Sequence, residues 1–156
     1  MRARPQSAQR IRDLAKTFSI SVDINAAPEK VWAVMSDVER WPEWTASIRS
    51  VTRLDAGPFV VGARARVRQP KLLPADFVVT ELDERKGFTW VTSSPGITAT
   101  AKHLIEPIPR GTRATLSVEF EGIAASIVAW MTRDLNDRYL ALEAAGLKRR
   151  VETGVA

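Results

Sequence analysis

Hydrophobic and polar residues alternate along a short segment near the N-terminal end of the chain. From Phe18 to Ile24 every second position is apolar, and serine or aspartate occupies the positions between. Successive side chains of a strand point to opposite faces of a sheet, so this alternation predicts a strand with one buried face.

Six further segments have the same strand-like character and are separated by residues that favour turns. The turn signals include Gly57-Pro58, Pro95-Gly96 and the stretch from Pro107 to Gly111. Connections this short favour antiparallel pairing of successive strands over crossover units. The expected strands are Ser47–Leu54, Ala63–Gln69, Phe77–Asp83, Phe88–Ser93, Thr98–Glu106 and Arg113–Glu121.

Helical patterns follow the first strand and close the chain. Pro28 suits the first position of a helix, where its missing N–H costs nothing, and two short helical segments are expected up to about Ala46. The last segment, Ile123 to about Arg150, contains no proline. As one helix it would be about 40 Å long and would lie across the whole sheet. Its apolar residues at helical spacing include Ile127, Met131, Leu135, Leu142 and Gly146.

Four local motifs occur in a characteristic order. They are Pro28-Glu29-Lys30-Val31-Trp32, Trp41-Pro42-Glu43-Trp44, Phe88-Thr89-Trp90, and the stretch from Pro109 to Thr115. In this order they resemble the START-like (SRPBCC) superfamily, in its polyketide cyclase/dehydrase and lipid-transport branch. The resemblance implies an α+β helix-grip fold. In that fold a curved, seven-stranded antiparallel sheet wraps around a long C-terminal helix, two short helices follow strand 1, and a hydrophobic cavity lies between sheet and helix.

The length and the charge distribution predict one domain with basic ends. The 156 residues suit a single core, expected over 17–152, with tails at 1–16 and 153–156. The net charge is +5, but residues 1–16 carry five basic side chains against one acidic, and residues 146–156 carry three against one. The domain body is therefore almost neutral, which argues against a nucleic-acid-binding surface.

Several kinds of chemistry lack the residues they need. The chain has no cysteine and one histidine, so neither a thiolate site nor a zinc site is expected, and no cofactor is predicted. The iron ligands of the superfamily's Rieske-linked oxygenases are missing as well. No apolar run approaches the roughly 20 residues of a membrane span. The basic N-terminus lacks the apolar region of a signal peptide, and a cytoplasmic location is expected.

His103 is the sharpest candidate for chemistry. It lies on the apolar face of its expected strand, where the small side chains of Ala99 and Ala101 leave space beside it. One interpretation is a general acid/base, or a partner for a ligand carbonyl or hydroxyl. The other is a core histidine that is satisfied by a protein hydroxyl or carbonyl. No carboxylate at an evident spacing would orient the ring.

The inward faces of the strands and of the long helix supply the expected cavity wall. Trp32 and Trp41 are interpreted as core residues, and Trp130 as either exposed near the entrance or buried. Asp76 is either a turn residue or a polar group near the cavity mouth. The expected ligand-binding residues are Trp44, Ala65, Val67, Phe88, Trp90, Ala101, His103, Leu116, Phe120, Met131, Leu135 and Tyr139.

Three functions remain open at this point. The first is binding of a hydrophobic or amphipathic small molecule, for which the resemblance implies a lipid, a polyketide-like ring or an isoprenoid. The second is a cyclase or dehydratase that uses His103 to move protons. The third is a protein-interaction module acting through the basic ends. The expected partner is a small hydrophobic ligand. No nucleic acid is expected, membrane contact is compatible with the sequence but is not expected, and both a monomer and a homodimer are compatible with it.

Overall fold

The computed structural model describes residues 16–154, which form seven strands and four helical segments. The tail expected over 1–16 lies, apart from Lys16, outside the described residues, and Lys16 itself begins the first strand. No helix within the described range is long and apolar enough to cross a membrane. The strands are β1 (Lys16–Ile24), β2 (Ser50–Arg53), β3 (Arg64–Arg68), β4 (Ala75–Asp83), β5 (Gly87–Ser94), β6 (Ile97–Ile108) and β7 (Gly111–Glu121).

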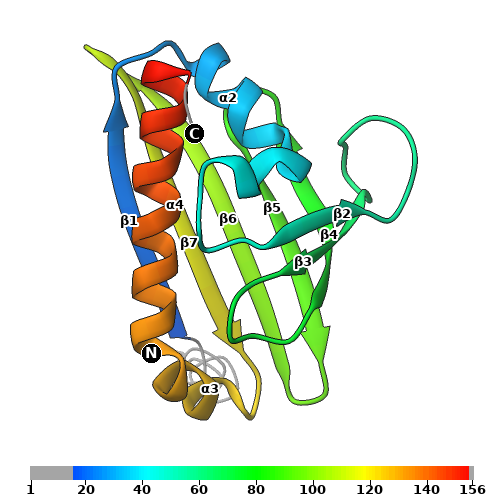
Figure 1. Cartoon of the computed structure of the whole chain (residues 1–156). Coiled ribbons are helices and arrows are strands. Elements are labelled where there is room, and N and C mark those ends of the chain that lie inside the picture. The colour runs from blue at the N-terminus through cyan, green and yellow to red at the C-terminus, as the bar shows by residue number, and fades with distance from the viewer. Residues whose placement is uncertain (1–15, 155–156) are drawn as a thin grey trace, which may run out of the picture.

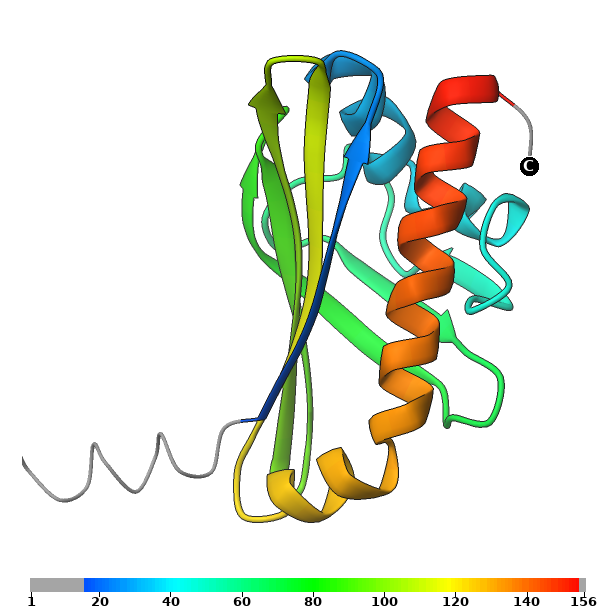
Figure 2. The same ribbon diagram turned by 90° about the vertical axis from the view of Figure 1, so that its left-hand side faces the viewer.

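All seven strands belong to one antiparallel sheet with the order β1-β7-β6-β5-β4-β3-β2 (Figure 1). The long C-terminal helix α4 (Arg133–Thr153) lies across one face of this curved sheet (Figure 2). This is the helix-grip arrangement that the sequence predicts. Short hairpin turns connect the strands from β3 to β7, so neighbours in sequence are also neighbours in the sheet.

The alternation of apolar and polar residues assigns the faces of the strands correctly. Ala65 and Val67 are buried on β3, whereas the three arginines between and beside them are exposed. Arg66 forms a 2.7 Å ion pair with Asp76, its partner across the β3–β4 ladder. Asp76 therefore lies on the outer face and not at the cavity mouth. Arg64 forms a second ion pair on this face, with Asp55 at 3.8 Å.

Two short helical segments follow β1, as expected. Helix α2 (Pro28–Ser36) begins at Pro28 and buries Val31 and Met35. The 3-10 segment η1 (Val38–Glu43) then brings Trp41 into the core, where its indole Nε1 donates a 3.0 Å hydrogen bond to the Met35 carbonyl. This bond fixes the ring of Trp41 in one orientation.

The expected long C-terminal helix is confirmed, but its expected start at Ile123 is wrong, because the segment forms two helices. Helix α3 (Ala125–Met131) ends at Thr132, and α4 begins at Arg133. The hydroxyl of Thr132 donates a 2.7 Å hydrogen bond to the Val128 carbonyl, and such side-chain bonds compete with the helical backbone pattern. Helix α3 leaves Ile127, Trp130 and Met131 exposed, so Trp130 is a surface residue.

Helix α4 presses closely on the segment that follows η1. Gly146 faces Trp44, and a Cβ atom at this position would lie 2.0 Å from the Trp44 carbonyl oxygen. Trp44 is buried in the same core as Leu147 and Val151 of α4. Glycine at position 146 therefore sets how near the helix comes to the wall of the domain.

Candidate ligand-binding cavity

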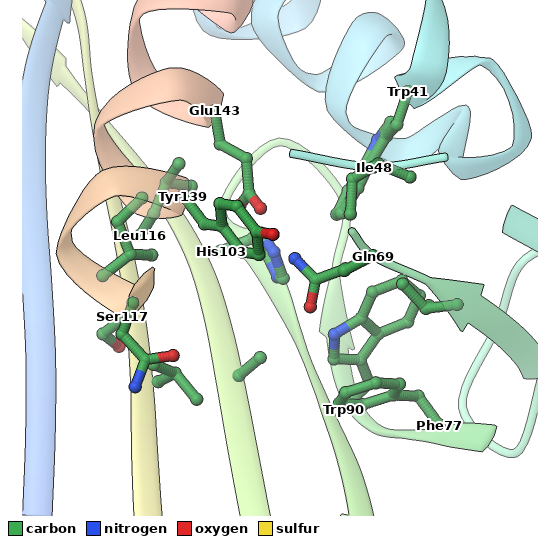
Figure 3. A pocket seen from close by; sticks show the side chains of 15 residues that line it. Trp41, Ile48, Gln69, Phe77, Trp90, His103, Leu116, Ser117, Tyr139 and Glu143 are labelled. Atoms are coloured by element: carbon green, nitrogen blue, oxygen red, sulfur yellow. The ribbon is translucent and has the colours of Figure 1, made fainter. Parts of the chain in front are cut away.

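A cavity of about 90 Å³ lies between the inner face of the sheet and α4 (Figure 3). Strands β3 to β7 supply one side, α4 supplies the other, and residues beside β2 and β3 close it. A water molecule needs about 10–15 Å³ of such space, so the cavity has room for several waters or one small ring. Its lining residues are Trp41, Ile48, Val67, Gln69, Phe77, Trp90, Ala101, His103, Leu116, Ser117, Val118, Asn136, Tyr139, Leu140 and Glu143.

One wall of the cavity is aromatic. Phe77 of β4 and Trp90 of β5 pack with ring centroids 5.0 Å apart, and Trp41 lies 5.4 Å from Trp90. The bond from Trp41 to the Met35 carbonyl and the burial of Trp90 hold these rings in place. Rigid flat walls of this kind suit ring-containing ligands.

His103 projects from β6 into the same space and is buried. Its ring stacks on Phe88, with centroids 4.5 Å apart and planes 15° apart, and it lies 5.0 Å from the ring of Trp41. Burial lowers the pKa of His103 to about 3, and the Phe88 backbone opposes this only in part. The imidazole is therefore neutral at neutral pH, and its Nδ1 has no hydrogen-bond partner among the described residues.

The low pKa changes the role open to His103. A general base works best when its pKa lies near the operating pH, and a pKa near 3 leaves the imidazole only weakly basic. Among residues 16–154, no carboxylate is hydrogen-bonded to the ring. His103 is suited to accept or donate one hydrogen bond to a ligand, which is the role of ligand partner considered for it beside that of a general acid/base.

Glu143 is a buried carboxyl on the α4 side of the cavity. Its Oε1 accepts a 3.0 Å hydrogen bond from the hydroxyl of Ser47, and that hydroxyl also contacts the Thr45 hydroxyl at 2.9 Å. Burial raises the pKa of Glu143 to about 7, and the Ser47 hydroxyl opposes the rise. The side chain thus exchanges a proton in the physiological range.

Three amide and phenol side chains complete the polar side of the cavity. The Tyr139 hydroxyl donates to the Pro70 carbonyl, and Gln69 Nε2 donates to the Ser47 carbonyl at 3.3 Å. Asn136 Nδ2 donates to the Thr132 hydroxyl at 2.9 Å. Figure 3 shows Glu143, His103, Gln69 and Tyr139 around one space, with Trp90 and Phe77 facing them.

Half of the residues expected to bind ligand line this cavity. They are Val67, Trp90, Ala101, His103, Leu116 and Tyr139. Trp44, Ala65 and Phe88 are buried in the core behind the wall, and Phe120 and Leu135 are partly buried without reaching it. Met131 is 71% exposed on α3, because the helix breaks at Thr132. Trp41, interpreted as a core residue, holds the wall position expected for Trp44.

Sequence reasoning missed Glu143, although the sequence contains a signal for it. Glu143 lies four residues after Tyr139 and four before Leu147, so all three share one helical face. The expected buried face of the helix was centred on Leu135 and Leu142. The face that α4 actually turns to the cavity is rotated away from these two residues. Gln69 and Ile48 fall inside the expected strands but lie just outside β3 and β2 in the structure. Alternation from Ala65 and Val67 places Gln69 on the inward face, so the sequence held a signal for Gln69 as well.

The described residues 16–154 contain no group of three or more side chains suited to hold a metal ion. What the arrangement offers is an apolar recess, one carboxyl that titrates near neutrality and several hydrogen-bond acceptors. This combination can bind and orient a small molecule with a polar head, and it can move a proton to or from that head.

Comparisons with known proteins agree with this picture. The family model for polyketide cyclase / dehydrase and lipid transport matches residues 15–152. Among solved structures, a protein from Thermus thermophilus has a TM-score of 0.71 and 16% identity, covering 90% of this chain and 100% of that one. Ara h 8.0201 has a TM-score of 0.67 and 17% identity, with 88% and 97% covered.

Norcoclaurine synthase from Thalictrum flavum is also similar, with a TM-score of 0.67 and 13% identity over 88% of this chain and 86% of that one. At these identities the structural likenesses show the fold alone. No curated protein matches the sequence at a significant level.

Proposed function

This chain belongs to the polyketide cyclase / dehydrase and lipid transport family, and we propose that it binds a hydrophobic or amphipathic small molecule in the cavity between the sheet and α4. The observation that carries this proposal is the pairing of an aromatic wall with a polar wall. Trp41, Phe77 and Trp90 would enclose the apolar body of the ligand. Glu143, His103 and the Tyr139 hydroxyl would orient its polar group.

The size of the cavity favours a compact ligand. Sites for drug-sized molecules usually enclose about 300–1,000 Å³, and this one encloses about 90 Å³. Of the classes that the family suggests, a single-ring or short isoprenoid compound fits better than a long lipid. Burying about 150 Å² of apolar ligand surface contributes roughly 4 kcal/mol, before the cost of ordering the ligand.

Native mass spectrometry of gently purified protein tests the proposal, with extraction and identification of any bound compound. A stoichiometric apolar or amphipathic compound is the expected result. A panel of single-ring and isoprenoid compounds should also raise the melting temperature. A protein that is empty as purified and gains no stability from any compound of the panel contradicts the proposal.

A second function is supported by the titration of Glu143. A buried carboxyl with a pKa of about 7 can give or take a proton at neutral pH, as the catalytic acids and bases of many enzymes do. We therefore infer that, if the protein is a cyclase or dehydratase, Glu143 and not His103 moves the proton. Turnover that survives in His103→Gln and is lost in Glu143→Gln would support this assignment, and the reverse pattern would overturn it.

The interaction module acting through basic ends stays a prediction, because most of the basic N-terminal residues lie outside the described range. Deleting residues 1–16 and measuring partner binding tests it. The cytoplasmic location expected from the sequence is a prediction too.

A further inference from the structure

The cavity wall carries a single side chain that becomes charged in the physiological range. Glu143 is the one acidic residue among the lining residues of the described chain, and neither lysine nor arginine lines the cavity. The other titratable side chains facing this space are His103 on β6 and Tyr139 on α4. Burial keeps His103 neutral at neutral pH. Among the described lining residues, Glu143 therefore contributes the one negative charge, and no basic side chain stands beside it as a counter-ion.

The hydrogen bonds around the cavity engage the hydroxyl protons of Ser47 and Tyr139, and several acceptor oxygens remain. Ser47 donates to Glu143 and the Tyr139 hydroxyl donates to the Pro70 carbonyl, while the amides of Gln69 and Asn136 each donate one of their two N–H groups to a protein oxygen. The carboxylate of Glu143, the phenol oxygen and the two amide oxygens are all acceptors. A ligand that matches these oxygens supplies hydrogen-bond donors.

The aromatic wall also favours a positively charged ligand. Trp41, Phe77 and Trp90 present ring faces and edges to the same space as Glu143. A cation near the face of an aromatic ring is attracted by the ring quadrupole, most strongly when water is excluded. A carboxylate head group would meet both this quadrupole and the charge of Glu143, and would find no cation to pair with.

We propose that the cavity selects a compact ring compound bearing a protonated amine, with the ammonium group seated against Glu143 and the ring between Trp41, Phe77 and Trp90. An ammonium group combines a positive charge with up to three donors, and it matches the wall in both respects. The proposal rests on the proposed binding function and names the ligand class for that site. It excludes anionic amphiphiles such as fatty acids as preferred ligands.

Four single-ring probes of similar shape test this selectivity by NMR-detected titration at pH 8. They are benzylamine, benzyl alcohol, benzoate and toluene, which differ in the head group alone. We expect benzylamine to bind at least about tenfold tighter than benzyl alcohol, a difference equal to about 1.4 kcal/mol, and benzoate to bind weakest.

Glu143→Gln keeps the size of the side chain and removes its charge. This variant should lose at least about tenfold in affinity for benzylamine, leave benzyl alcohol within about twofold, and improve benzoate. Glu84→Gln is the matched control, because it removes the same charge from an exposed turn.

A pH series on the wild-type protein tests the same selectivity and does not depend on the folding of Glu143→Gln. Since the pKa of Glu143 is about 7, benzylamine should bind several-fold more weakly at pH 5.5 than at pH 8, and toluene should bind equally at both.

The outcomes separate this proposal from the function on which it rests. If toluene and benzyl alcohol bind but benzylamine gains nothing over them, the cavity binds ligands and the amine selectivity is wrong. Benzoate binding as tightly as benzylamine overturns the selectivity in the same way. If none of the four probes binds, the binding function itself fails, and the amine proposal fails with it.

Discussion

The hydroxyl of Ser47 donates a 3.0 Å hydrogen bond to Oε1 of Glu143, joining the segment before β2 to the middle of α4. Both side chains are buried, and no lysine or arginine lines the adjoining cavity within the described residues. Burial raises the pKa of the Glu143 carboxyl, and the bond from Ser47 opposes this rise, so that the pKa is about 7. One hydroxyl therefore helps to decide whether the cavity is charged at neutral pH.

Replacing Ser47 by alanine should raise the pKa of Glu143 further. The hydroxyl favours the charged carboxylate, so its loss shifts the balance towards the protonated form. A buried acceptor that loses its donor also costs about 1–3 kcal/mol of stability. Titration of the Glu143 carboxyl carbon by NMR measures the shift. Thr45→Val is the control, because the Thr45 hydroxyl contacts Ser47 but not Glu143. A pKa that falls in Ser47→Ala contradicts the role given to this bond.

Glu143 should make the protein less stable as the pH rises. The folded-state pKa of about 7 lies above the usual value of 4.5, so the folded state holds more protons than the unfolded state between these values. Glu143→Gln removes this difference. Relative to wild type, the variant should gain about 3 kcal/mol between pH 4.5 and pH 8. Urea unfolding at both pH values measures the gain, and an equal difference at the two pH values would show that the carboxyl is not perturbed.

His103 should have the opposite effect in acid. Its pKa of about 3 lies below the usual 6.5, so the unfolded state binds the proton more readily and stability falls as the pH drops from 6.5 towards 3. His103→Phe keeps a ring against Phe88 and cannot be protonated. We expect its acid unfolding midpoint, followed by circular dichroism, to lie below that of wild type. Between pH 4.5 and 6.5 the titration of Glu143 changes the stability in the opposite direction to that of His103. The control therefore compares Glu143→Gln with the double variant Glu143→Gln, His103→Phe, in which Glu143 no longer contributes.

The fold follows from the sequence because its signals are local. Each strand face is given by alternation within one strand, as in Arg64 to Arg68, and short turns make the sheet antiparallel. The position of Pro28 likewise marks the start of α2. These features depend on residues a few positions apart, so no knowledge of distant contacts is needed.

The site was less predictable because it depends on how α4 is rotated against the sheet. The break at Thr132 separates Met131 from the residues that face the cavity, and the close approach of Gly146 to Trp44 sets the rotation of α4. Neither contact can be read from periodicity. The sequence also placed Trp44 in the cavity wall and Trp41 in the core, whereas Trp41 lines the cavity in the structure. The reason is again a contact that periodicity does not give, because the hydrogen bond to the Met35 carbonyl turns Trp41 towards the cavity.

Gly146→Ala should destabilise the protein although alanine is the better helix former. An added Cβ would lie 2.0 Å from the Trp44 carbonyl oxygen, so the helix or the segment after η1 must move. We expect a loss of about 3 kcal/mol or more, against a gain of about 1 kcal/mol from helix propensity alone. Thermal unfolding measures the loss. Ala145→Gly, on the exposed face next to it, should cost about 1 kcal/mol. A stabilised Gly146→Ala would mean that α4 has room to move away from Trp44.

Filling the cavity should abolish ligand binding without unfolding the protein. Ala101 lies on the cavity wall, opposite Trp90 in the β5–β6 ladder, and its small side chain leaves part of the space open. Ala101→Leu adds three carbon atoms, which occupy much of a space of about 90 Å³. Added apolar contact should offset local crowding, so stability should change by less than about 1.5 kcal/mol.

Affinity of Ala101→Leu for the single-ring probes should fall at least about tenfold in the same NMR titration. Thr100→Leu is the matched control, because position 100 points to the opposite face of β6 and the variant should bind as wild type does. If Ala101→Leu folds and binds these probes unchanged, the ligand site lies elsewhere in the protein.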